Sequence, residues 1–592
     1  MPGNSQETVE ATSLAVLVDE HLYNYDSVRH KNMSVANSLR AAAARRLFGV
    51  RPAVRGNHVA SDVLLDAVVT YGTAERCTLF AYASNNNALL SRFHSHLQRR
   101  NGEYLEIIPL SGILQDRVGD RKISTWFNPM PHCSVNGGVE VSYRVRERHG
   151  GVYPITTLIH GLNSHAQLYS VFVRLLLEST LSCDSLICTS RASYVALVNL
   201  LEATAERFHS KLDMKLKYGG RVDVVPLCVN ANHFRPSDVN GKLRTRKTLG
   251  VSPEAVVIVT LGRLSAMTKA DLLPFCETLR ALVGRRGGSR VHWLITGTED
   301  PGYSKVIRQR AQDLGVSNNV SIILNPSDTD KIELLRASDI FLLLSDTVDE
   351  SFGLAPIEAM ACGIPQVVAD WSGFRDTVVQ GVTGFLVPTY WAECHGDLGS
   401  ASAIGSPLAD FVQVGQSTAA DLRRAQEYLE CLIDRKDMRL EMGRRSRERA
   451  LMEYDGAVVA GKYEQLWSEL RAVASTLSFS RVSGGIDHID YDRTFRHYAT
   501  KVLDDETLLQ PTDIAKARGA EAILSQVVSL PEFVDRRLAA AVMQAMVCDE
   551  RTVRMGELLS KICSDTHSSP WHARRQLMWL IKYGYVELRK TK

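Results

Sequence analysis

The sequence predicts an α/β protein built around parallel sheets. Short apolar runs, such as residues 255–261 and 340–344, are too short for helices and lead into polar residues, which is typical of strands buried on both faces. Segments of helical character separate these runs, and such alternation of strand and helix is the pattern of α/β folds. At roughly 150 residues per domain, the length of 592 residues corresponds to about three or four domains.

Composition narrows the class of protein. The 69 basic and 66 acidic residues leave a net charge of +3, and this near-balance argues against binding of polyanions along the whole chain. The 11 cysteines include no CxxC pair, so neither a zinc ribbon nor a disulfide framework is indicated. The N-terminus is polar and acidic, and no run of about 18 apolar residues appears. We therefore expect a soluble protein of the reducing cytoplasm.

The stretch 349–370, DESFGLAPIEAMACGIPQVVAD, predicts a loop, a helix and a strand. Pro356 fits the first turn of the helix, and Gly363 marks its end. Because this helix follows the strand 340–344, its free N–H groups and the positive end of its dipole should lie at the carboxyl edge of the sheet, where anions bind. The expected cradle is the backbone of Phe352, Gly353 and Leu354.

Two glutamates accompany this helix. Glu350 lies in the loop before it and Glu358 one turn inside it, so both can face one ligand, and two acceptors suit the hydroxyls of a sugar. In the alternative interpretation, Glu350 only complements the helix dipole and Glu358 is a solvated surface acid. The two acids alone do not decide between these interpretations.

The stretch ESFGLAPIEAMACGIPQVVA resembles the donor-site signature of glycosyltransferase family 4, whose members are retaining enzymes with the GT-B fold of two facing Rossmann-like domains. The resemblance implies that Glu350 contacts the donor sugar and Glu358 the ribose of a nucleotide sugar. It covers roughly residues 150–470.

A second segment supplies positive charge. The strand 255–261 runs into Gly262 and Arg263, and Lys269 follows six residues later. An arginine fork and a lysine charge at the carboxyl edge of a sheet can neutralise a diphosphate leaving group, although the alternative of two surface cations is common. GRLSAMTKADLL also resembles the phosphate-binding segment of the family, which implies that Arg263 and Lys269 hold the donor diphosphate.

The first domain contributes one candidate. The strand 155–159 delivers His160 to the carboxyl edge of its sheet. A lone histidine in this place is often structural, but His160 resembles the histidine that family members place against the donor sugar. No spacing typical of a metal site occurs, so we expect no catalytic metal and no cofactor, with the nucleotide sugar as a substrate.

The predicted organisation has three parts. Residues 1–235 are an acceptor-side Rossmann-like domain, residues 236–475 a donor domain with a cross-over helix, and residues 476–592 a mainly helical extension outside the resemblance. Within the first part, residues 34–51 form a basic helix candidate that could lie on an anionic bilayer, although a solvated helix is the preferred interpretation. Strands are expected at residues 13–18, 77–81, 104–109, 122–127, 153–159, 185–189, 222–226, 255–261, 291–296, 321–325, 340–344 and 366–369.

The extension predicts helices at residues 536–547, 553–562 and 570–582 and a strand at 585–588, an order like that of a winged helix. Basic residues beside Trp571 and Trp579 raise the possibility of nucleic-acid binding. We prefer a protein-contact module or a packing extension, because these tryptophans and the leucines share a helical spacing and are expected to form a core.

Together these features predict a retaining glycosyltransferase that uses a nucleotide-sugar donor. The acceptor is not indicated and could be a saccharide, a lipid, a small molecule or a protein. The alternatives are a phosphorylase or synthase of the same fold, and a catalytically silent sugar-nucleotide sensor with a nucleic-acid-binding tail.

Overall fold

The structure is a computed structural model that describes residues 12–18, 56–81, 105–109, 123–129, 132–133, 137–138, 140–162, 165–266, 268–287, 290–394, 414–478, 490–517, 534–549 and 552–589. The chain divides into two compact units. The larger unit contains the second large sheet and most of the first, and the smaller consists mainly of residues from 484 onward. The basic helix candidate 34–51 lies outside the described residues.

The first sheet has seven strands in the order β3-β2-β1-β4-β7-β8-β9, and its pairs from β1 to β9 are parallel. The strands are β1 (Ser13–Val18), β2 (Arg76–Ala81), β3 (Leu105–Pro109), β4 (Thr125–Asn128), β7 (Ile155–Ile159), β8 (Ser185–Cys188) and β9 (Arg221–Val224). All seven lie within a residue or two of the predicted strands, except that β4 begins three residues later. Its helices are α3 (Gly56–Tyr71), α6 (Glu140–His149), α7 (His165–Leu177) and α8 (Arg191–Leu212).

The second sheet has the order β12-β11-β10-β13-β14-β15, and all neighbouring strands are parallel. Its strands are β10 (Val256–Leu261), β11 (Val291–Gly297), β12 (Val320–Leu324), β13 (Ile340–Leu343), β14 (Gln366–Ala369) and β15 (Gly384–Val387). This is the doubly wound Rossmann order, in which ligands bind where the order reverses, outside the carboxyl ends of the two central strands. Those strands are β10 and β13.

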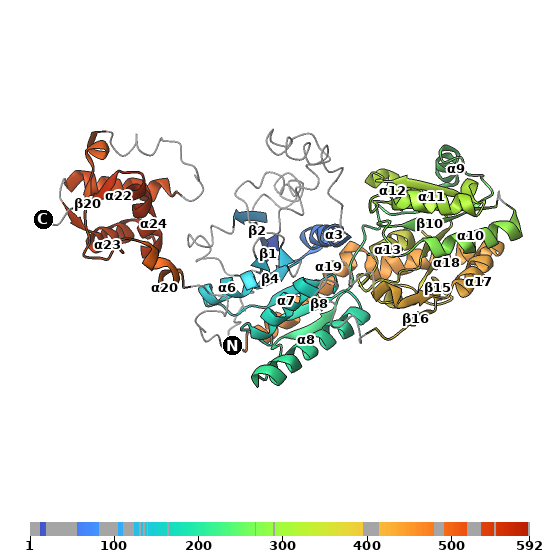
Figure 1. Cartoon of the computed structure of the whole chain (residues 1–592), viewed down its shortest axis with the longest axis horizontal. Helices are drawn as coiled ribbons and strands as arrows, with labels where there is room; N and C mark the ends of the chain where they lie inside the picture. The colour runs from blue at the N-terminus through green and yellow to red at the C-terminus, as the bar shows by residue number, and fades with distance from the viewer. Residues whose placement is uncertain are drawn as a thin grey trace, which may run out of the picture. The chain divides into compact units, whose positions relative to one another are not determined.

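The second sheet is flanked by helices, of which α9 precedes its first strand and the others follow its strands (Figure 1). They are α9 (Val239–Thr248), α10 (Leu273–Arg286), α11 (Tyr303–Asp313), α12 (Asp328–Arg336), α13 (Leu354–Ala361), α14 (Phe374–Thr377), α17 (Leu422–Asp434) and α18 (Lys436–Arg449). A small antiparallel pair, β16 (Thr389–Trp391) and β17 (Thr418–Ala420), was not predicted.

Helix α19 (Gly456–Ala474) returns to the first sheet, where Figure 1 shows it in orange among blue and cyan elements. It packs along α3. The indole N–H of Trp467 donates to the Thr156 hydroxyl at 3.1 Å, and Arg471 donates to Thr125 at 3.1 Å. The C-terminal helix of the larger unit is therefore part of the core of the first sheet.

The chain connects the two sheets in two segments, one at Val229 and one at residues 454–456, which are hydrogen-bonded to each other. The N–H of Val229 donates to the carbonyl of Tyr454 at 2.8 Å, and the N–H of Gly456 donates back to Val229 at 3.2 Å. Beside them the Asn230 side chain accepts from the N–H of His233 at 3.0 Å and so holds the turn that follows Val229.

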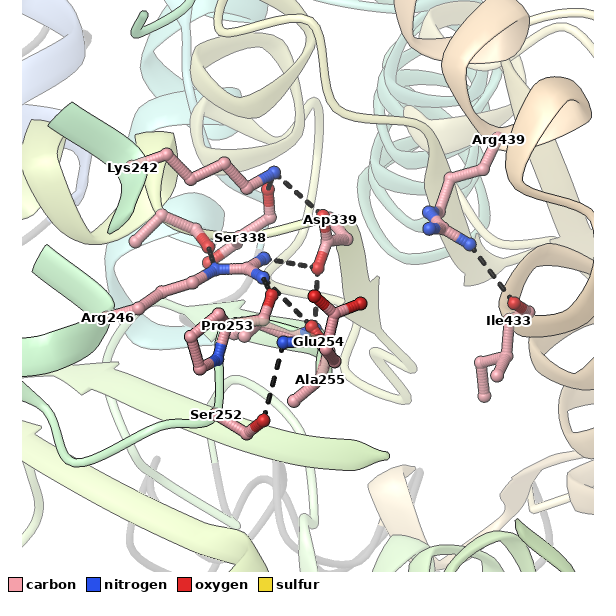
Figure 2. A network of polar contacts seen from close by, with 12 residues as sticks. Lys242, Arg246, Ser252, Pro253, Glu254, Ala255, Ser338, Asp339, Ile433 and Arg439 are labelled. Atoms are coloured by element: carbon pink, nitrogen blue, oxygen red, sulfur yellow. Dashed lines mark hydrogen bonds and ion pairs between the residues drawn. The ribbon is translucent and has the colours of Figure 1, made fainter. Parts of the chain in front are cut away.

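A buried network of charges anchors α9 to the amino ends of β10 and β13 (Figure 2). The Asp339 carboxylate pairs with Arg246 and accepts from Lys242 at 2.7 Å and from the N–H of Val257 at 2.8 Å. Burial raises the pKa of Asp339, but the charges of Lys242 and Arg246 outweigh it and hold the pKa below its usual range. The guanidinium of Arg246 also donates to the carbonyls of Pro253, Ala255 and Ala337.

The smaller unit contains helices packed on an antiparallel sheet of order β19-β18-β20. Its elements include β18 (Leu508–Pro511), α22 (Arg536–Asp549), β19 (Val553–Arg554), α23 (Met555–Thr566), α24 (Pro570–Lys582) and β20 (Val586–Leu588). The predicted helices and last strand are confirmed, except that residues 553–554, predicted as the start of a helix, form β19; the central strand β18 was not predicted either. The winged-helix interpretation stays a prediction.

The prediction that both tryptophans of α24 form the core is wrong for Trp571, which is 70% exposed. The core side of the helix is formed by Ala573, Leu577 and Leu580, and Trp579 packs against it. Trp571 falls on the opposite face of the 3.6-residue period. Within the part of the chain that the structure describes, no helix is long and apolar enough to cross a membrane.

We predict that Asp339→Ala destabilises the protein by about 3–5 kcal/mol, because it leaves Arg246 buried without its counter-charge. Glu427→Ala, which removes an exposed pair with Arg424, should cost less than about 1 kcal/mol. Denaturant unfolding measures both. Since the folded pKa of Asp339 is depressed, its contribution is complete above the unfolded value of about 3.9 and is lost as pH falls through the folded pKa. An Asp339→Ala cost that does not shrink in acid would contradict this account.

Candidate active site

The carboxyl end of β10 brings two cations to the point where the strand order reverses. Gly262 has φ 156° and Gly297, at the end of β11, φ 144°. A Cβ at Gly297 would lie 1.7 Å from the carbonyl oxygen of Gly262, so the two strand ends approach too closely for any side chain. Gly262, Arg263 and Lys269 line a small hollow at this end of the strand. The two glycines therefore set the position of the two cations.

The two cations differ in their partners. Lys269 forms an ion pair with Glu350. The Nε of Arg263 is buried and has no hydrogen-bond partner in the structure. Among the described residues, no carboxylate lies within ion-pairing distance of Arg263, which leaves its guanidinium available to an anionic ligand.

Both predicted glutamates are buried. Glu350 is 6% exposed and Glu358 8% exposed, so the alternative of a solvated surface acid at Glu358 is wrong. Lys331 on α12 donates to the Glu358 carboxylate at 2.8 Å, and its ammonium lies 4.9 Å from the centre of the Phe234 ring. Each buried carboxylate thus has its own lysine, which holds it in place for hydrogen bonds from a ligand.

The N-terminus of α13 lies beside these carboxylates. Gly353 precedes the helix with φ 99° and no side chain caps it, so the N–H groups of the first turn are not satisfied by a cap. A Cβ at Gly353 would lie 2.5 Å from the ring of Phe374. Phe352 is 1% exposed and its ring packs on Tyr454, so only its backbone can contribute to a binding site.

His160 lies at the carboxyl end of β7, as expected, and contacts the same loop. Its ring is 7% exposed, with Nε2 2.8 Å from the Ser61 hydroxyl and 2.9 Å from the carbonyl of Pro129. Its own carbonyl accepts a hydrogen bond from Ser351, the residue after Glu350. The backbone of His160 therefore touches the loop, while the role of its ring toward a sugar stays a prediction.

Further contacts hold this loop that the sequence did not indicate. The Ser190 hydroxyl donates to the carbonyl of Ser351 at 2.7 Å. The indole N–H of Trp371 donates to the carbonyl of Thr347 at 2.8 Å. These contacts, like that of Lys331 with Glu358, join residues far apart in the chain, and no local pattern signals them.

One carboxyl near the loop has a pKa well above the usual value of an aspartate. Asp346, after the carboxyl end of β13, has its pKa raised to about 6, first by burial and further by the charge of Asp271. Asp271 itself accepts a hydrogen bond from the Tyr303 hydroxyl at 2.9 Å. Asp346 therefore gains a proton as pH falls below about 6. Among the described residues, no group of three or more histidine, cysteine, aspartate or glutamate side chains is arranged to hold a metal ion.

Residues 242–398 match the family model described as Glycosyl transferases group 1. A protein of Segniliparus rotundus named D-inositol 3-phosphate glycosyltransferase is 34% identical over 191 residues, which are 32% of this chain and 40% of that protein. A protein of the same name from Rhodococcus opacus is 31% identical over 214 residues, covering 35% of this chain and 45% of its own length. The chain therefore spans less than half the length of these two relatives.

The fold also has a solved counterpart. The crystal structure of Anabaena Alr3699/HepE in complex with UDP matches 77% of this chain and 100% of its own, with a TM-score of 0.50 and 16% identity. With the two Rossmann-like sheets, this likeness defines the fold as GT-B. Residues 242–398, which match the family model, carry Arg263, Lys269, Glu350 and Glu358.

We predict that Gly297→Ala destabilises the protein by about 3 kcal/mol or more, because the new methyl group overlaps the Gly262 carbonyl and the backbone angle disfavours a side chain. The matched control is Gly284→Ala in α10. There an added Cβ would have no neighbouring atom within 4 Å outside its own helix, and φ does not lie in the left-handed region. That change should stabilise by up to about 1 kcal/mol. Equal midpoints of thermal unfolding for the two variants would refute the close approach of the strand ends.

Proposed function

We propose that this protein is a retaining glycosyltransferase that moves a sugar from a nucleoside diphosphate to an acceptor. The observation that carries the proposal is the gathering of two cations and two buried carboxylates where the order of the second sheet reverses. In such a sheet this is the place for a nucleotide. Residues 242–398 match the family model described as Glycosyl transferases group 1, and this match supports transfer of a sugar as the class of reaction.

Each group has a defined task in the proposed reaction. As the bond between the sugar and the phosphate breaks, negative charge grows on the diphosphate and positive character grows on the sugar carbon. Arg263, Lys269 and the N-terminal N–H groups of α13 stabilise the diphosphate. We propose that this charge is neutralised without a metal ion, that Glu350 and His160 hold the sugar, and that Glu358 binds the ribose.

The reaction class is tested by incubating the protein with a panel of nucleotide sugars and measuring nucleotide release. Release from at least one donor, with retention of the anomeric configuration in the product by NMR, is the expected result. No nucleotide release from any donor, together with formation of a sugar 1-phosphate from a glycan and inorganic phosphate, would favour a phosphorylase of the same fold. Binding of a nucleotide sugar without any release would favour a silent sensor.

For Arg263→Ala, we predict that the affinity for nucleoside diphosphates (UDP, ADP or GDP) falls about 10- to 100-fold, which corresponds to one lost charge-assisted hydrogen bond. The affinity for the corresponding nucleoside should stay within about twofold, because the guanidinium acts on phosphate alone. Arg285→Ala, an exposed residue paired with Glu430, is the control. Titration calorimetry that finds equal losses for nucleoside and diphosphate would remove Arg263 from the diphosphate site.

The two carboxylates should separate binding from turnover. Glu358→Gln is predicted to weaken the nucleoside and the nucleoside diphosphate equally, by about 10-fold, because a ribose contact is present in both ligands. Glu350→Gln should leave nucleoside affinity unchanged and lower kcat, because its contact is with the reacting sugar. If calorimetry and initial rates show the opposite pattern, Glu350 binds the ribose and Glu358 the sugar. If neither substitution has an effect, the donor site lies elsewhere.

A further inference from the structure

An exposed aromatic group flanks the loop of Glu350. The rings of Trp371 and Trp391 stack with centroids 5.9 Å apart and an interplanar angle of 21°. Trp391 is 51% exposed. These two rings, here called the aromatic platform, lie on the segment after β14 and on β16, beyond the carboxyl end of the second sheet.

The aromatic platform is attached to the proposed donor site by direct contacts. The Trp371 indole holds the carbonyl of Thr347, whose hydroxyl in turn accepts from the N–H of Asp349 at 3.2 Å. In the same turn as Trp371, a Cβ at Gly373 would lie 2.4 Å from the carbonyl oxygen of Ser351. The turn that carries Trp371 therefore packs directly on the loop that carries Glu350.

Polar groups border the aromatic platform. Next to Trp371, Asp370 and Arg375 form a pair at 2.8 Å whose side chains are 39% and 57% exposed. Flat apolar faces with hydrogen-bonding groups at their edges suit a ligand that has an apolar C–H face and a rim of hydroxyls.

We propose that the aromatic platform is an acceptor subsite that stacks on a saccharide ring. The inference rests on the proposed transfer reaction and adds the acceptor class to it. A sugar ring has the required C–H face and hydroxyl rim, whereas an extended lipid chain has no such rim. Packing against the Glu350 loop puts the acceptor next to the donor sugar, where a transfer reaction needs it.

The proposal is tested with Trp391→Ala, with Trp391→Phe as the variant that keeps a ring, and with Tyr194→Ala on α8 as the control for loss of an exposed aromatic residue. The probes are methyl glycosides of glucose, galactose, mannose and N-acetylglucosamine, together with maltose and myo-inositol. Acceptor-dependent and acceptor-independent nucleotide release are measured separately, and saccharide binding is followed by intrinsic tryptophan fluorescence and by saturation-transfer NMR.

We expect at least one saccharide to bind saturably and to stimulate nucleotide release. Trp391→Ala should lower acceptor-dependent kcat/KM at least about 10-fold and abolish the saccharide NMR signal. Acceptor-independent hydrolysis and UDP affinity should stay within about twofold, and Trp391→Phe should retain most of the transfer.

Several results would overturn the proposal. Equal losses of hydrolysis and transfer would mean that the aromatic platform only supports the Glu350 loop. Loss of UDP affinity would mean that it stacks on the nucleobase. Stimulation by myo-inositol alone, or no saccharide signal at all, would exclude a saccharide subsite. If no donor releases nucleotide, the proposed function fails, while the NMR comparison of the wild type with Trp391→Ala still decides whether the aromatic platform binds sugars.

Discussion

The second sheet depends on the buried pairing of Asp339 with Arg246 and Lys242. Asp339 stands just before β13 and bonds the N–H of Val257 in β10, so one carboxylate fixes the amino ends of both central strands. Strands are nearly inextensible, and fixing their starts also fixes where their carboxyl ends emerge. Every charged residue of the candidate site follows one of these two carboxyl ends or, like Lys331, lies on the helix after β12. The charge network at the amino ends of β10 and β13 thereby sets the geometry of the candidate site at their carboxyl ends.

Much of this arrangement follows from local patterns. The strand 13–18 and the strand 366–369 are formed as predicted, because apolar runs of that length between polar residues have few other solutions in a parallel sheet. Gly262 follows β10 and Gly353 precedes α13, as predicted, and both have a positive φ that favours glycine. Of the residues singled out by the family resemblance, Lys269 and Glu350 form an ion pair.

What the sequence did not indicate depends on contacts between distant segments. Lys331 meets Glu358 across 27 positions, and Trp371 meets Thr347 across 24, and nothing in either neighbourhood specifies the partner. The strands β16 and β18 were missed for a related reason, since short strands gain their stability from pairing with a partner elsewhere in the chain. Trp571 was assigned to a core because its spacing from Trp579 fits a helix, but the spacing alone does not decide which face is buried.

The loop after β13 is held from three directions, and this has a consequence for binding. Lys269 comes from the second sheet, the carbonyl of His160 from the first, and Trp371 from the turn after β14. The contacts of His160 and Trp371 hold the loop itself, while the Glu350 side chain is held by Lys269 alone among the ion pairs of the described residues. In the proposed reaction, a diphosphate that attracts Lys269 weakens that pair, and the buried carboxylate of Glu350 then requires new hydrogen-bond donors. Under the same proposal the hydroxyls of the attached sugar are these donors, so binding of the phosphate and capture of the sugar are coupled through one lysine.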